Sequence, residues 1–138
     1  MTPPILVRAS SLSLAFAGVA RAVGAVAFDL EAIEESEVRE VRAHGATPEA
    51  LCAHFVNECL YVYEVEGFAW RRIDFAVFDV EPRPGAEPMR LHSFLHGQPL
   101  ELDGPPLRRP IRSISSDDVS VRALGEQFEL SIAIATPQ

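Results

Sequence analysis

The stretch from Thr47 to Phe68, TPEALCAHFVNECLYVYEVEGF, constrains the fold of this chain more than any other. Thr47 is a favourable N-cap residue, Pro48 fits the first helical position, and Gly67 can end a helix. At about 100° per residue, the apolar side chains of this predicted helix fall on one half of its surface. They are Leu51, Cys52, Phe55, Val56, Cys59, Leu60, Val62 and Tyr63. A helix with such an apolar side must be buried against a sheet or another helix.

The opposite side of this predicted helix is polar. It carries His54, Asn57, Glu58, Tyr61 and Glu64. A polar stripe of this kind can bind a partner, can simply be solvated, or can use its asparagine to brace a loop. We treat His54, Asn57, Glu58 and Tyr61 as candidate partner-binding residues, with the solvated surface and the bracing asparagine as alternatives.

Apolar periodicity and turn residues predict the other elements. A first helix, capped by Ser10 or Ser11 and running to about Val26, is apolar nearly all round, which is typical of a buried packing helix. Strands are expected over residues 5–9, 38–43, 73–80, 89–95, 111–115, 119–124 and 128–135, a turn over 82–88, and an excursion loop over 97–110. This order predicts the α+β class, with two helices packed on a mostly antiparallel β-sheet.

Length and charge narrow the class of protein. The 138 residues predict a single domain over residues 1–138. The net charge of −8 argues against direct nucleic acid binding, which needs clustered Lys and Arg, and it suits a basic protein partner. No stretch of about 18 apolar residues lacks a charge, so no membrane span is expected.

Two features bear on the cellular compartment. Leu12 to Phe28 resembles the apolar region of a secretory signal, but Arg21 interrupts it and only Arg8 precedes it as a positive side chain. Cys52 and Cys59 lie on one predicted helix with their Cα atoms roughly 10 Å apart, which is too far for a disulfide. Free buried thiols are consistent with a reducing cytoplasm, and we predict a cytoplasmic protein.

The sequence has none of the common catalytic motifs. G-x-G-x-x-G, the P-loop, G-x-S-x-G and H-E-x-x-H are all missing. His92 and His96 lie in a predicted strand, where roughly 13 Å separates them and prevents a shared metal ion. Asp117 and Asp118 follow several serines and can either hold a hard cation or form a turn, and the turn is favoured. We therefore expect no enzyme activity.

The segment from Phe55 to Tyr63, FVNECLYVY, followed by Glu66-Gly67-Phe68, resembles the signature helix of the archease family. That family typically shows an apolar residue, Leu-Asn-Glu-Leu-Leu-Tyr and then Glu-Gly-Phe. The similarity extends over roughly residues 5–135. It includes Val7-Arg8-Ala9, Leu12-Ser13-Leu14-Ala15-Phe16, Asp29-Leu30, His96-Gly97-Gln98-Pro99 and Ile111-Arg112.

The resemblance implies both an archease-like fold and a function. Archeases are small cytoplasmic activators of the RtcB-type RNA ligase, which joins RNA ends in tRNA splicing and RNA repair. They promote guanylylation of the ligase and multiple turnover, through a cluster of acidic residues that binds a divalent metal. In this sequence only Asp29 matches one of those acidic positions.

The sequence departs from the family at the other metal-binding positions. The family's N-terminal His-Thr-Ala-Asp motif has no counterpart, and Ala46-Thr47 replaces the acidic residue before the central helix. The family's Lys-Ala-x-Thr-Tyr-His segment corresponds to Arg112 to Asp117, and Ala133-Ile134-Ala135 occupies the place of a C-terminal Asp. One carboxylate cannot hold Ca²⁺ or Mg²⁺ tightly, because hard cations need several oxygen ligands.

We therefore predict a non-catalytic, archease-like accessory protein that contacts a protein partner. No cofactor is expected, with Ca²⁺ or Mg²⁺ bound only if the site at Asp29 is retained. An RNA-splicing ligase is the first candidate partner. Arg112, Asp117 and Asp118 join the helix stripe as candidate partner-binding residues. The alternative is a repurposed scaffold that binds another protein or a small ligand.

Overall fold

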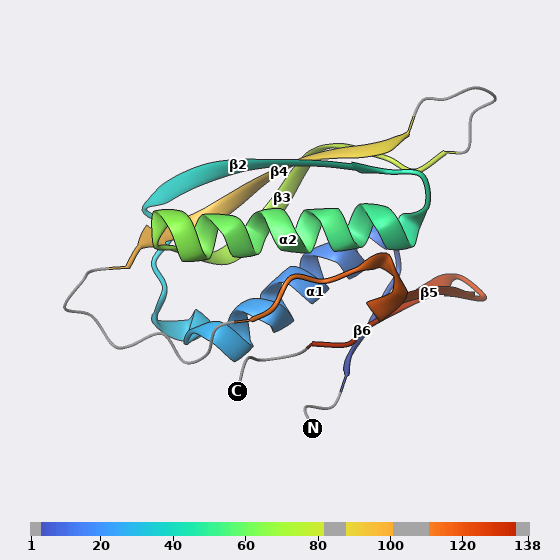
Figure 1. Ribbon diagram of the computed structural model, residues 1–138, viewed down its shortest axis with the longest axis horizontal. Helices are drawn as coiled ribbons and strands as arrows, with labels where there is room; N and C mark the ends of the chain where they lie inside the picture. Colours follow the sequence, from blue (N-terminus) through green and yellow to red (C-terminus); the bar gives the residue numbers. More distant parts are fainter. Residues whose placement is uncertain (1–3, 82–87, 101–110, 135–138) are drawn as a thin grey trace.

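The computed structural model describes residues 4–81, 88–100 and 111–134 (Figure 1). Its elements are β1 (Ile5–Ala9), α1 (Leu12–Ala27), η1 (Leu30–Ala32), β2 (Glu37–Gly45), α2 (Pro48–Glu66), β3 (Phe68–Asp79), β4 (Met89–Pro99), η2 (Ser116–Asp118), β5 (Val119–Leu124) and β6 (Gln127–Ile132), where η marks a short 3₁₀ helix. The predicted α+β class is confirmed. No helix in these ranges is long and apolar enough to cross a membrane.

The strands form two sheets rather than the one that the sequence suggested. Each sheet has three strands, in the orders β1-β6-β5 and β2-β4-β3, and every pair is antiparallel. Both helices contact strands of both sheets, and Figure 1 shows the β2-β4-β3 sheet above the helices and the β1-β6-β5 sheet below them. The two helices therefore supply the core that the sheets share.

The predicted central helix is confirmed as α2. The Thr47 side chain accepts a hydrogen bond from the Ala50 N–H at 3.1 Å, and Gly67 ends the helix with a left-handed φ of 65°. All eight side chains of the predicted apolar side are buried. Cys52 and Cys59 are free thiols, and burial raises the pKa of Cys52 to about 12 and that of Cys59 further still.

The first helix is confirmed as α1, and it is part of the core. Ser11 caps it by accepting a hydrogen bond from the Leu14 N–H at 3.2 Å. Phe16 and Val23 are fully buried, and the Trp70 indole N–H donates to the Ala20 carbonyl at 2.9 Å. The segment that resembles a secretory signal thus packs against the sheets.

The largest differences from the predicted strand boundaries lie in β3, β4 and β6. β3 begins at Phe68 instead of residue 73, because Phe68, Ala69 and Trp70 are all buried and a register shift after Trp70 breaks the alternation. β4 runs to Pro99 and so enters the predicted loop over 97–110, of which residues 101–110 lie outside the described residues. β6 ends at Ile132, three residues before the predicted limit of 135.

β3 and β4 pair antiparallel as a hairpin. Most of the predicted turn that joins them, residues 82–87, lies outside the described residues. Residues 125–126 form the turn between β5 and β6, with Gly125 at a left-handed φ of 63°.

Gly97 lets the β3 backbone approach β4 closely. It lies opposite Trp70 in β3 and Glu37 in β2. A Cβ atom added at Gly97 would overlap the carbonyl oxygen of Ala69 and lie 2.8 Å from the Trp70 Cα. Only glycine fits this position without a shift of the β3 backbone.

We expect Gly97→Ala to lower the free energy of unfolding by about 3 kcal/mol, because the backbone atoms it would meet cannot rotate away. Gly125→Ala is the matched control. Nothing lies within 4 Å of its added Cβ, so only the left-handed conformation opposes it, at about 1 kcal/mol. Urea unfolding of both variants measures the difference, and an equal loss in the two would contradict the close approach at Gly97.

Candidate functional site

The polar side of α2 forms a surface stripe. His54, Glu58 and Tyr61 are spaced by four and three residues, which places them on one side of the helix. Tyr61 is 56% exposed, and Val65, one turn further on, is 63% exposed. Val65 was not among the predicted site residues, although its spacing of four from Tyr61 is the signal that places it in the stripe.

His54 connects the stripe to the end of β2. Its Nδ1 lies 3.0 Å from the His44 backbone nitrogen and 3.1 Å from the His44 carbonyl oxygen. When Nδ1 accepts the His44 N–H, the ring proton resides on Nε2, which lies 3.4 Å from a Glu58 carboxylate oxygen. The His44 ring packs edge-on against the His54 ring at 4.8 Å between centroids. His54 and Glu58 are therefore held in place but remain partly exposed.

Asn57 fixes the segment that precedes β5. Its side-chain Nδ2 donates to the Ile114 carbonyl at 2.7 Å, and its Oδ1 accepts from the Ile114 N–H at 2.7 Å. These bonds replace the ladder bonds that a strand would need, and the Ile111 and Ile114 side chains are buried. The predicted strand over 111–115 is therefore wrong. Asn57 braces this segment, as one of its alternatives proposed.

Asp118 closes a turn next to the braced segment. Its carboxylate accepts from the Ser115 N–H at 3.0 Å, and its own N–H donates to the Ser115 carbonyl at 3.0 Å. The result is η2, which contacts α2. The turn favoured for Asp117 and Asp118 is confirmed, and the side chains of Arg112 and Asp117 are exposed. All the predicted partner-binding residues thus lie on α2 or on residues 111–118.

Asp29 lies apart from this surface. Its carboxylate caps η1 by accepting a hydrogen bond from the Glu31 N–H at 3.1 Å. Figure 1 shows the end of α1 and the residues after it at the opposite end of the molecule from β5. Asp29 therefore cannot share a cation with Asp117 or Asp118. Among residues 4–81, 88–100 and 111–134, no group of three or more His, Cys, Asp or Glu could hold a metal ion. The described residues therefore do not fit the divalent metal that the archease resemblance implies.

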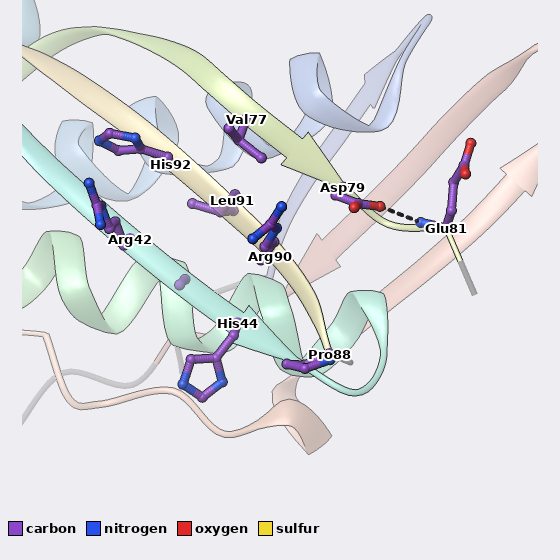
Figure 2. Close-up of a pocket in the computed structure, with 10 residues that line it drawn as sticks. Arg42, His44, Val77, Asp79, Glu81, Pro88, Arg90, Leu91 and His92 are labelled. Carbon is purple, nitrogen blue, oxygen red and sulfur yellow. Dashed lines mark hydrogen bonds between the residues drawn. The ribbon is translucent and has the colours of Figure 1, made fainter. Parts of the chain in front are cut away.

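A second surface feature is a cavity of about 610 Å³ on the side of the β2-β4-β3 sheet that faces away from the helices (Figure 2). Sequence reasoning missed it, because its residues come from three strands. Its lining residues are Arg42, Ala43, His44, Val77, Asp79, Glu81, Pro88, Arg90, Leu91 and His92.

We expect Asn57→Ala to lower the free energy of unfolding by about 2–3 kcal/mol, because it removes two hydrogen bonds and leaves the Ile114 amide and carbonyl unsatisfied. Glu58→Gln is the neighbouring control and should change stability by less than about 0.5 kcal/mol, since its carboxylate is partly exposed. Urea unfolding together with amide exchange at Ile114 tests this. If Asn57→Ala costs no more than Glu58→Gln, Asn57 does not brace the segment.

The sequence of this chain is similar to those of known proteins. The Archease protein family (MTH1598/TM1083) matches residues 4–134. Protein archease of Pyrococcus abyssi (strain GE5 / Orsay) is 27% identical over 114 residues, which cover 83% of this chain and 77% of that protein. The Drosophila melanogaster protein archease-like is 26% identical over 107 residues, which cover 77% of this chain and 65% of that protein.

Two solved structures share the fold. The solution structure of Methanobacterium thermoautotrophicum protein 1598 aligns over 97% of this chain and 91% of that chain, with a TM-score of 0.72 and 15% identity. The crystal structure of a Thermotoga maritima archease aligns over 99% and 91%, with a TM-score of 0.55 and 12% identity. Because the family match covers nearly the whole sequence, this chain belongs to the archease family.

Proposed function

We propose that this chain is an accessory protein that modulates an RtcB-type RNA ligase in the cytoplasm through direct protein–protein contact. Archeases are non-catalytic proteins that activate this ligase, and family membership over residues 4–134 is the observation that carries the proposal. The pathway is then tRNA splicing or RNA repair. The family metal has no part in the proposal, since the described residues do not fit it.

The α2 stripe and residues 112–118 are the proposed contact surface. This surface lies on the helix that carries the family's signature motif, and it combines exposed side chains of two kinds. Tyr61 and Val65 offer apolar area, while Glu58, Asp117 and Asp118 carry negative charge. Aromatic anchors ringed by charge are typical of protein interfaces.

Charge complementarity supports an RNA-processing enzyme as the partner. An enzyme that holds RNA ends needs clustered basic side chains to neutralise phosphates. This chain carries a net charge of −8 and no lysine. An acidic protein is attracted to such a basic surface over about 8–10 Å at physiological salt, which raises the association rate.

We expect Glu58→Arg to weaken binding to an RtcB-type ligase of the same organism by at least about tenfold, because it places a positive charge in the proposed contact. Glu126→Arg is the matched control. Glu126 lies in the turn between β5 and β6, outside the proposed surface, and its reversal should leave the affinity unchanged.

Biosensor titration with the purified ligase measures both affinities, and multiple-turnover RNA ligation measures activation. Equal affinity of the two variants would remove the α2 stripe from the interface. If the wild-type protein neither bound the ligase nor changed its turnover, the proposed function itself would be wrong.

A further inference from the structure

The outward side of the β2-β4-β3 sheet gathers basic side chains from two strands. Val41 and Ala43 of β2 and Leu91 of β4 are buried on the helix side, so their neighbours project outward. Arg42 lies opposite His92, and Arg90 lies two residues before His92 on the same strand. The three side chains line one side of the sheet at separations of roughly 5–8 Å between their Cβ atoms.

Within the described residues, the two arginine side chains and the His92 Nε2 atom have no hydrogen-bond partner. Arg42 and Arg90 form no hydrogen bond or ion pair with any residue in the described ranges. The Nε2 atom of His92 is buried and has no hydrogen-bond partner there. Its nearest carboxylate oxygen, on Glu40, lies at 3.5 Å without hydrogen-bond geometry. A buried polar atom without a partner is unusual and calls for one.

The cavity is also divided by charge. Figure 2 shows Arg42 and His92 toward one end, Asp79 and Glu81 toward the other, and Arg90 between them. Asp79 accepts a hydrogen bond from the Glu81 N–H at 3.3 Å. Val77, which is 38% exposed, and Pro88 add apolar surface. A volume of about 610 Å³ lies within the range of small-molecule sites.

We propose that this cavity binds a small phosphorylated molecule, with its phosphate between Arg42 and Arg90, next to the His92 ring. The two guanidinium groups can donate converging hydrogen bonds to the phosphate oxygens, and charge-assisted bonds of this kind are the strong ones. The body of the molecule lies over Val77 and Pro88.

The ligand class follows from the carboxylates around the basic end. Glu40 lies beside His92, Asp79 lies directly opposite Arg90 on β3, and Glu81 follows Asp79 by two residues. A nucleic acid strand that entered this end would bring further phosphates against those carboxylates and against the protein's net charge of −8. A molecule with one phosphate group meets less of that repulsion than a strand with several.

Calorimetric titration with phenyl phosphate and phenol tests the proposal. Phenyl phosphate should bind with a dissociation constant at or below about 1 mM, and phenol should bind at least about tenfold more weakly. Arg42→Gln and Arg90→Gln should each weaken phenyl phosphate binding by at least about fivefold. Glu40→Gln should tighten it, because a nearby negative charge is removed.

Arg122→Gln is the control, since Arg122 is an exposed arginine of β5 in the other sheet. All four substitutions lie at exposed positions, and circular dichroism confirms that each variant is folded. Phenol binding as tight as that of phenyl phosphate would overturn the proposal. So would wild-type affinity in both Arg42→Gln and Arg90→Gln, or an equal loss in Arg122→Gln. The cavity is separate from the α2 stripe. The outcome of this titration and the effect of Glu58→Arg on ligase binding therefore do not depend on each other.

Discussion

Burial of the apolar side of α2 is the interaction on which the rest of the structure depends. α2 contacts β2, β3 and β4 in one sheet and β5 in the other, so this helix joins the two sheets. Burying one Leu, Phe or Val side chain contributes about 1.5–3 kcal/mol. Because one side of α2 is committed to the core, only its polar side is available to a partner. The same helix therefore sets both the fold and the proposed contact surface.

The fold could be predicted from sequence wherever the signals were local. Thr47, Pro48 and Gly67 mark the ends of α2, and its apolar spacing fits one helical side, so the helix was predicted to the residue. The conformation of residues 111–115 depends instead on a residue that is distant in the sequence. The apolar residues of this segment favour a strand, but the Asn57 side chain, 57 positions away, takes the Ile114 backbone bonds. A bonding partner so distant in the chain has no local signature.

The candidate sites likewise divide into those that local sequence signals predict and those that depend on strand pairing. Helical spacing alone places His54, Glu58 and Tyr61 together, and the Ser-Asp composition of residues 115–118 predicts their turn. The outward cavity needs Arg42 beside His92, a pairing of β2 with β4 across 50 positions that periodicity cannot supply. The fold also places the acidic residues Asp29, Asp117 and Asp118 far apart. Asp29 follows α1 at one end of the molecule, while η2 lies against α2 near β5 (Figure 1).

This archease-family chain keeps the scaffold of the family, and the central claim of our proposal is that it does so without the family's metal site. Calorimetric titration of the purified protein with Mn²⁺, Mg²⁺ and Ca²⁺ tests that claim most directly. The Asp29 carboxylate caps η1, and no group of three or more His, Cys, Asp or Glu among the described residues could hold a metal ion. Because hard cations need several oxygen ligands, we predict no binding tighter than about 1 mM for any of the three ions. Stoichiometric binding at micromolar concentration would contradict the claim and would restore a metal to the mechanism.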